Sequence, residues 1–375
     1  MKIGIDARNL VTKTTGISRY VQEMTRQLAL AGHEIFLYIP ERPNAEPIKA
    51  SNVRVRVSNF AGGPRRMIWA QTVLTRQASR DDIDVFWGPA HRLPFYLDRK
   101  IARVVTIHDL VWRDQTSTMR LQTRLADQLL MKPAANSADR IVVDSIATGE
   151  ALCVLSEKYR NKLRVIYPGI TELTGATQPD TVPLFGIDRP YILFVGTLEP
   201  RKNLKKLLEA YSLLPDEVRR DLLLVLAGGQ GWRLHDLEQH IANLNLQGSV
   251  RLTGYVSDQQ LSKLYQNAEF LAMPSLYEGF GFPIVEANAA GVPVLTSNIS
   301  SMPEVGGTAA FFVDPNDVRS IAAGLKQMAT DPLLREKLAQ ASLFNARRFD
   351  WNLSASRLQE VFNDAIALRA RSNRR

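Results

Sequence analysis

The sequence predicts an α/β protein built from two doubly wound parallel sheets. Its 375 residues exceed what one hydrophobic core ordinarily organises, so we expect two domains. In both halves short apolar runs alternate with longer amphipathic stretches, as strands joined by crossover helices do. A stretch rich in Thr, Gly and Pro at 170–188 separates the halves. We therefore expect domains at 1–175 and 176–350, followed by a last helix within 351–375.

In the first half the apolar runs predict a helix over 18–31 and strands at 2–6, 34–39, 53–57, 84–87, 104–107 and 140–144. Ligands of such sheets bind beyond the carboxyl ends of the strands, so residues that follow strands are candidates. Gly16 lies in the loop after the first strand. His108 follows a later strand, where an exposed imidazole can meet a ligand, although a hydrogen-bonded loop histidine is the alternative. Asp109 would orient His108 or cap the next helix, and Ser145 is expected to cap a helix.

The second half repeats the alternation. It predicts strands at 191–195, 222–227, 250–253, 270–273, 293–296 and 310–313, and helices at 317–329 and 332–348. After the first of these strands a helix running to Leu214 would place Lys202 near its start. A lysine there offers a flexible charge with three donors, and the neighbouring Arg201 offers a forked pair.

The chain is organised around residues 274–295, which predict a loop, a glycine turn, a helix and a buried strand. Pro283 suits a first helical turn and Gly291 ends the helix. The positive helix end favours an anion, most simply phosphate, at the N–H groups of Gly279, Phe280, Gly281 and Phe282. Glu278 and Glu286 flank the turn, and ionised carboxylates only accept hydrogen bonds. A ligand with both phosphate and hydroxyl groups, such as a nucleotide sugar, fits this combination.

The run EGFGFPIVE, with Glu278 and Glu286 separated by seven residues, resembles the signature of the retaining GT-B glycosyltransferases of family 4. The resemblance covers nearly the whole chain. It implies two Rossmann-like domains facing a central cleft, with the acceptor in the first and a nucleoside-diphosphate sugar in the second. It also implies that the C-terminal helix at 351–375 crosses back to the first domain. Glu286 would hold the ribose hydroxyls and Glu278 the transferred sugar. No metal or other cofactor is implied, because the helix start and Lys202 can stabilise the leaving diphosphate.

Other family motifs are matched with departures. The family's first loop usually has two adjacent glycines. Here only Gly16 matches, and Thr15 replaces the other glycine. His108 would contact the transferred sugar. The family's donor-phosphate motif is Arg, four residues, Lys. Lys202 matches it, but Thr197 occupies the Arg position, and Arg201 would supply the missing charge. Tyr255 and Val256 would line the nucleobase pocket through backbone groups.

The run GTLEPRKN is similar to mannosyltransferases of bacterial surface polysaccharide assembly, including lipopolysaccharide, so GDP-mannose is the expected donor. UDP-glucose and deoxysugar donors stay open. The acceptor would be a glycan or a polyprenyl-diphosphate-linked glycan. Two alternatives are a sugar-nucleotide epimerase or hydrolase on the same fold and a non-catalytic basic scaffold that binds membrane.

The net charge of +9 lies wholly in residues 1–175. No nucleic-acid-binding motif accompanies it, so an anionic bilayer surface or a lipid-diphosphate acceptor explains it better. The stretches 63–80 and 114–132 are amphipathic and basic. In the first, Arg65 and Arg66 beside Met67, Ile68 and Trp69 would contact lipid, unless these apolar faces pack on the sheet.

The single cysteine, Cys153, a strand-like N-terminus and the lack of a run of roughly 20 apolar residues predict a cytoplasmic protein. With the basic half, we expect it at the cytoplasmic face of the inner membrane. The acidic pair at 82 and 84 has metal-binding spacing but precedes a strand, so we interpret it as a turn.

Overall fold

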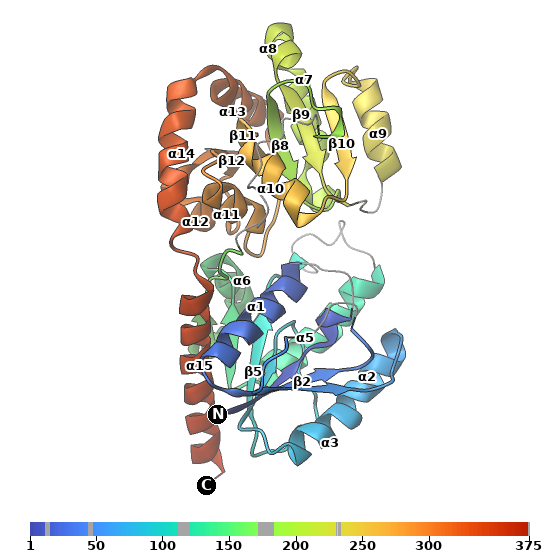
Figure 1. The fold of residues 1–375 in the computed structure, drawn as a ribbon, viewed down its shortest axis with the longest axis vertical. Coiled ribbons are helices and arrows are strands. Elements are labelled where there is room, and N and C mark those ends of the chain that lie inside the picture. Colours follow the sequence, from blue (N-terminus) through green and yellow to red (C-terminus); the bar gives the residue numbers. More distant parts are fainter. Residues whose placement is uncertain are drawn as a thin grey trace. The chain divides into compact units, whose positions relative to one another are not determined.

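The computed structural model describes residues 1–11, 16–43, 48–111, 121–171, 184–229, 231 and 234–373, and two compact units can be distinguished (Figure 1). The N-terminal unit contains the described residues of 1–169 together with 349–373. The C-terminal unit contains those of 170–348. Each has its own parallel sheet with helices on both faces, as the sequence predicts.

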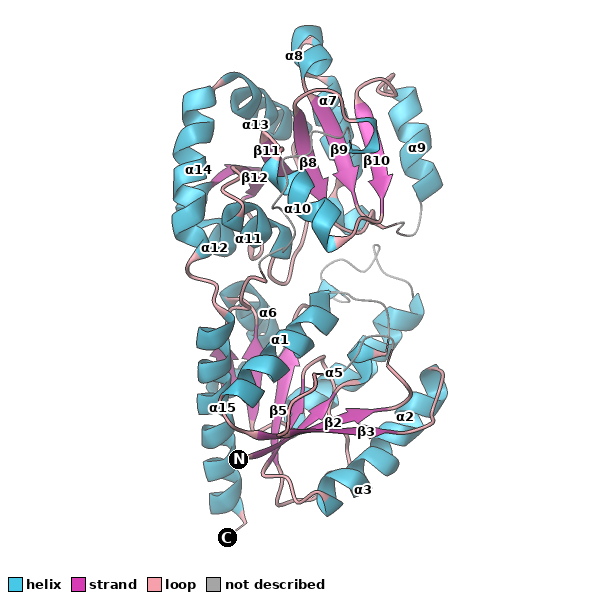
Figure 2. Cartoon of the chain, viewed as in Figure 1, coloured by secondary structure: helices cyan, strands magenta, loops and turns pink. Residues whose placement is uncertain are grey.

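The N-terminal sheet has seven parallel strands in the order β3-β2-β1-β4-β5-β6-β7. Their bounds are β1 Lys2–Asp6, β2 Glu34–Ile39, β3 Val53–Val57, β4 Val85–Gly88, β5 Ala102–Ile107, β6 Arg140–Val143 and β7 Leu163–Val165. The neighbouring strands β2 and β3 of this sheet lie side by side in Figure 2. The first three strands have the predicted bounds, and the next three differ by one or two residues. The strand order reverses between β1 and β4, which makes this the topological switch point where such sheets bind ligands.

Both faces of this sheet are buried, because alternate residues of its strands enter different cores. Ile35, Leu37 and Ile39 pack with α1, whereas Phe36 and Tyr38 pack on the opposite side with α2 and α3. The α-helices of the unit are α1 Gly16–Leu30, α2 Gly63–Gln71, α3 Val73–Arg80, α5 Leu121–Ser137, α6 Ile146–Leu155 and α15 Trp351–Ser372, with short 3₁₀ turns at Arg8–Leu10 and Glu157–Lys162.

The last helix, α15, packs on the N-terminal unit beside α1 and β5. Asp350 caps its start, because the side chain accepts from the Leu353 N–H at 2.7 Å. Its buried residues recur at helical spacing and join the core around β1: Trp351, Ala355, Leu358, Phe362 and Ala365. On its other side Asp364 accepts from Arg140 Nε at 2.6 Å. The end of the chain is therefore part of the first unit's core.

The expectation that Trp69 lies at a membrane interface is wrong. Its ring is fully buried, its N–H donates to Ser58 Oγ at 3.0 Å, and the Arg8 guanidinium lies 5.5 Å from the ring centroid. The stretch at 63–80 forms two helices rather than one, with a break at Thr72. Trp69 and Ala70 face the core, while the preceding Met67 and Ile68 face outward. In the second basic stretch, at 114–132, residues 114–120 lie outside the described residues.

The C-terminal sheet has six parallel strands in the order β10-β9-β8-β11-β12-β13. Their bounds are β8 Tyr191–Val195, β9 Leu223–Ala227, β10 Val250–Gly254, β11 Phe270–Met273, β12 Val294–Ser297 and β13 Ala310–Val313. Its α-helices are α7 Leu204–Ser212, α8 Asp216–Asp221, α9 Leu234–Asn243, α10 Asp258–Gln266, α11 Phe282–Ala289, α12 Met302–Gly306, α13 Val318–Thr330 and α14 Pro332–Ala346, with 3₁₀ turns at Leu184–Gly186, Pro200–Lys202 and Gly307–Ala309. The order repeats that of the first six strands of the N-terminal sheet, and its switch point lies between β8 and β11.

Within the part of the chain that the structure describes, no helix is long and apolar enough to cross a membrane. The predicted linker at 170–188 lies mostly outside the described residues.

Candidate active site

The candidate site is built at the switch point of the C-terminal sheet. Strands β8 and β11 are parallel neighbours there, with Ile192 opposite Phe270. The segments that leave their carboxyl ends are 196–202 and 274–281, so the two predicted donor-binding motifs meet although they lie far apart in sequence. An open parallel sheet binds its ligand at this place.

The sequence predicts a continuous helix with Lys202 near its start. In the structure Lys202 instead ends the 3₁₀ turn Pro200–Lys202. The break occurs at Asn203, which adopts a left-handed conformation with φ 62°, tolerated by Asn better than by most residues. The Asn203 side-chain amide donates to the carbonyls of Pro274 at 3.0 Å and Pro315 at 2.8 Å. Asn203 therefore anchors the Lys202 turn to the segment that follows β11.

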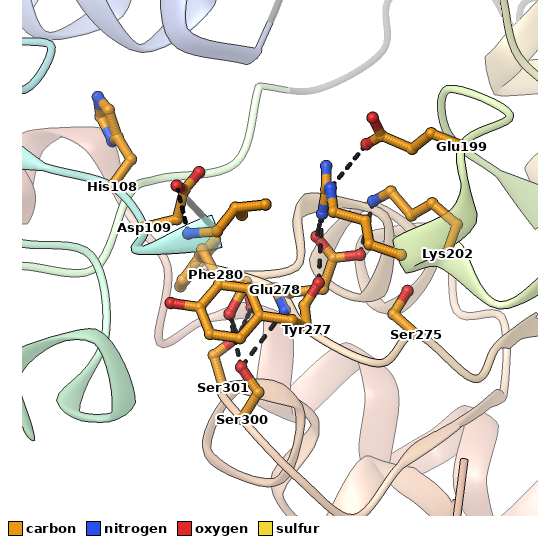
Figure 3. A network of polar contacts seen from close by, with 12 residues as sticks. His108, Asp109, Glu199, Lys202, Ser275, Tyr277, Glu278, Phe280, Ser300 and Ser301 are labelled. Atoms are coloured by element: carbon orange, nitrogen blue, oxygen red, sulfur yellow. Dashed lines mark hydrogen bonds and ion pairs between the residues drawn. The ribbon is translucent and has the colours of Figure 1, made fainter. Parts of the chain in front are cut away.

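Lys202 and Arg201 both bind the carboxylate of Glu278 (Figure 3). Lys202 Nζ donates to Oε1 at 2.6 Å, and Arg201 donates to Oε2 at 2.8 Å. The Arg201 Nε lies 2.6 Å from Glu199 Oε1. Lys202 and Glu278 are buried, and Arg201 and Glu199 are partly buried. The cluster thus contains two cations and two carboxylates in balance.

Burial and the neighbouring charges shift the pKa values of both Lys202 and Glu278. Desolvation lowers the pKa of the Lys202 ammonium, and the charge of Glu278 offsets part of this effect. Desolvation acts to raise the pKa of Glu278, but the charges of Lys202 and Arg201 outweigh it and lower the pKa to about 2. The carboxylate is therefore ionised at neutral pH, where it can only accept hydrogen bonds.

Two serines that the sequence analysis missed hold the turn around Glu278 (Figure 3). Ser301 Oγ lies 3.0 Å from the carbonyl of Glu278 and 2.8 Å from that of Phe280, so its one proton is shared between these two acceptors. Ser300 accepts from the Glu278 N–H at 3.3 Å and lies 2.8 Å from the Glu278 carbonyl. Ser297 and Thr296 bond the preceding carbonyls of Ser275 and Met273. The concentration of hydroxyl residues at the end of β12 and just after it is the signal that could have revealed them.

Helix α11 begins at Phe282, with Gly281 as N-cap and Pro283 in the first turn. Gly281 has φ 109°, a conformation that side-chain-bearing residues rarely adopt, so glycine is required there. One turn into the helix, Glu286 accepts from the Tyr265 hydroxyl of α10 at 2.9 Å. Tyr265 is a second residue that sequence reasoning did not find. An anion at this helix start stays a prediction.

The remaining predicted donor residues lie around this cluster to different degrees. Thr197 is exposed in the loop after β8, two residues before Glu199. Tyr255 is exposed and Val256 is half-buried, and both follow β10, which β9 separates from β8. Ser257 caps α10 with a capping box. The structure does not bring Tyr255 or Val256 into contact with the Lys202 cluster.

Two candidates belong to the N-terminal unit. Gly16 is the exposed first residue of α1, and 12–15 before it lie outside the described residues. His108 follows β5 but is buried rather than exposed, with Nδ1 2.5 Å from Asp144 Oδ2 and Nε2 2.7 Å from the Pro89 carbonyl. Asp144, not Asp109, orients the ring; Asp109 accepts from the Val111 N–H at 3.2 Å. Ser145 caps α6, as predicted.

No group of three or more His, Cys, Asp or Glu side chains among the described residues is arranged to hold a metal ion. The acidic pair at 82 and 84 forms a turn into β4, where Asp84 accepts from the Lys2 N–H at 2.7 Å.

Comparisons with known proteins agree with this architecture. A family model described as Glycosyl transferases group 1 matches residues 182–343, and one described as Glycosyltransferase Family 4 matches residues 14–172. O-antigen chain mannosyltransferase B of Escherichia coli is 32% identical over 388 aligned residues, covering 94% of this chain and 96% of the relative.

Two solved structures show the same fold. Sucrose-phosphate synthase from Thermosynechococcus elongatus superimposes with a TM-score of 0.78 at 19% identity, covering 98% of this chain and 99% of that chain. HepE of Anabaena, in complex with UDP and glucose, has a TM-score of 0.72 at 18% identity, covering 97% and 99%. At these identities the likeness concerns the fold alone. Together with the identity and coverage of the Escherichia coli relative, it shows that this chain belongs to glycosyltransferase family 4, the retaining glycosyltransferases of GT-B fold.

Proposed function

We propose that this glycosyltransferase moves mannose from GDP-mannose, with retention of configuration, to a glycan or polyprenyl-diphosphate-linked glycan in bacterial surface polysaccharide synthesis. The observation that carries this proposal is the match along nearly the full length to a mannosyltransferase that builds an O-antigen chain. The run at 196–203, which resembles mannosyltransferases in sequence, forms the Lys202 side of the charge cluster, and the two cations of this cluster support donor binding there.

Donor binding would replace the ion pairs of the charge cluster by contacts with the donor. Glu278 forms ion pairs with both Lys202 and Arg201. The donor diphosphate would displace the carboxylate from these cations, and Glu278 would then accept hydrogen bonds from the hydroxyls of the transferred sugar. Glu286 would hold the ribose. The two cations and the start of α11 would stabilise the leaving diphosphate, so no metal is required.

The transfer would occur on one face of the sugar, with a donor phosphate oxygen taking the acceptor proton. With a polyprenyl-diphosphate-linked acceptor, the enzyme would act at the cytoplasmic face of the inner membrane, with the basic N-terminal unit at the lipid surface.

Incubation with GDP-mannose, UDP-glucose and a dTDP-sugar, with and without a lipid-linked acceptor, tests the proposal. We expect acceptor-dependent transfer of mannose that persists in a chelator, and the greatest thermal stabilisation by GDP, since a ligand that binds only the folded state raises its stability. Donor hydrolysis or isomerisation without transfer would favour the epimerase or hydrolase alternative. Absence of turnover with every donor would favour the scaffold.

A further inference from the structure

A buried polar cluster lies at the carboxyl ends of β4, β5 and β6 in the N-terminal unit. It contains His91, His108 and Asp144, and Tyr20 of α1 packs its ring edge-on against His108 at 5.0 Å between centroids. The two histidine rings are 5.6 Å apart. All four side chains are buried, so their proton positions are set by one another rather than by solvent.

The partners of His108 define its protonation. The carbonyl of Pro89, 2.7 Å from Nε2, can only accept, so Nε2 carries a proton. Nδ1 lies 2.5 Å from the carboxylate oxygen of Asp144, which also accepts. Both nitrogens therefore donate, and the ring is an imidazolium.

His91 is in the opposite state. Its Nε2 accepts from the backbone N–H of His108 at 3.0 Å, so this nitrogen carries no proton. Its backbone N–H donates to the Thr106 carbonyl at 2.9 Å, which fixes the loop that carries the ring. The two neighbouring histidines are thus one cation and one neutral acceptor.

The charges around His108 favour its cationic form. Burial acts to lower the pKa of His108, but the charge and hydrogen bond of Asp144 raise it, with smaller contributions from the Pro89 carbonyl and from Asp109. Tyr20 stays neutral because burial and the charge of Asp144 raise the pKa of its hydroxyl. The second oxygen of Asp144 has no hydrogen-bond partner among the described residues. The carboxylate therefore acts on the imidazole through a single oxygen.

We propose that Asp144 is a positioning residue that holds His108 as an imidazolium, so that His108 serves its site as a fixed positive hydrogen-bond donor and not as a base. The Nε2–H of His108 can exchange its acceptor, from the Pro89 carbonyl to an oxygen of a bound substrate, while the proton stays on Nε2. This inference deepens the proposed function, and its kinetic consequence rests on that function; the protonation state itself does not.

NMR of protein labelled with ¹⁵N-histidine tests the protonation directly, with the His108 signals identified from a His108→Gln variant. In the wild type at neutral pH we expect both ring nitrogens of His108 in the protonated range and one nitrogen of His91 in the unprotonated range. A wild-type His108 with one unprotonated nitrogen would overturn the proposal, and this measurement needs no Asp144 variant to fold.

Asp144→Asn then tests the cause. We expect His108 to lose a ring proton at neutral pH and turnover to fall as the pH rises, whereas Asp144→Glu should restore the wild-type pH profile in part. An unchanged His108 spectrum in Asp144→Asn would overturn the role of Asp144. A wild type that is inactive with every donor but keeps the expected spectrum would count against the proposed function alone.

Discussion

Lys202 Nζ lies 2.6 Å from Glu278 Oε1, although the two residues are 76 positions apart in the chain. The bond spans the switch point between β8 and β11, and Arg201 binds the other oxygen of the same carboxylate. Because Glu278 pairs with both cations, a donor diphosphate that binds them as proposed would compete with this carboxylate. This competition can be measured.

Glu278→Gln should bind GDP more tightly than the wild type while losing transfer. The amide keeps the shape of the carboxylate but not its charge, so Lys202 and Arg201 would attract the diphosphate by on the order of 1 kcal/mol more. Titration calorimetry with GDP and an assay of transfer check the two effects. Glu217→Gln, an exposed carboxylate on α8, is the matched control and should change neither. Weaker GDP binding by Glu278→Gln would refute the competition.

Glu278→Gln should also change how the free energy of unfolding depends on pH. The folded pKa of Glu278 is about 2 against an ordinary 4.5, so ionised Glu278 stabilises the fold above pH 4.5 and that contribution disappears as the pH falls toward 2. We expect the gap in unfolding free energy between wild type and Glu278→Gln to be on the order of 3 kcal/mol at pH 6 and to close near pH 2. Chemical denaturation across this range measures it; a gap that does not depend on pH would contradict the ion pair.

Lys202→Ala should weaken GDP binding by roughly 1.5–3 kcal/mol, the cost of a lost charge-assisted contact. Arg201 remains on Glu278 in this variant, so the carboxylate keeps one partner. Lys205→Ala removes an exposed lysine three positions later and serves as the control. If the two variants bind GDP equally well, Lys202 does not contact the donor.

The strands and most caps could be predicted from the sequence because periodicity and local residue choice determine them. The partners of the site residues could not. Ser301 reaches Glu278 and Phe280 across more than 20 positions, and Asp144 reaches His108 across 36. Such contacts depend on which strands are neighbours and on their register. The sequence pattern does not predict either of these. Trp69 was misplaced for a related reason: Arg65, Met67 and Ile68 before it are exposed, and only the helix phase shows that its ring points to the core.

Tyr265→Phe should raise the KM for GDP-mannose several-fold and leave kcat less affected, if Glu286 holds the ribose. The tyrosine hydroxyl is 2.9 Å from Glu286 and orients its carboxylate, a hydrogen bond worth about 1 kcal/mol. Initial-rate kinetics separate KM from kcat, and a thermal melt reports the loss of stability. Tyr96→Phe removes an exposed hydroxyl of the N-terminal unit as the control. An unchanged KM would leave Tyr265 with a structural role only.

The last prediction concerns the lipid surface. With Trp69 buried, the exposed apolar residues of α2 are Met67 and Ile68, which are 48% and 59% exposed. The loop with exposed Phe95 and Tyr96 lies against the end of this helix, because the Phe95 N–H donates to Gln71 at 2.7 Å. Arg65 is exposed beside them, whereas Arg66 is paired with Glu41. Arg65 and Ile68 are therefore the contacts to change, and reversing Arg66 would also break an ion pair.

We expect the wild type to sediment with anionic vesicles at low salt and to be released as salt rises, since each basic residue near the surface contributes about 1 kcal/mol and salt screens it. Arg65→Glu/Ile68→Ser should sediment much less, because it loses both the charge and the apolar contact. Arg220→Glu/Leu333→Ser makes the same change of charge and a similar change of exposed apolar surface in the C-terminal unit, so it should sediment like the wild type. An equal loss of sedimentation in both variants would mean that only the net charge of the protein matters. Sedimentation that does not depend on the lipid charge would exclude this patch as a membrane contact.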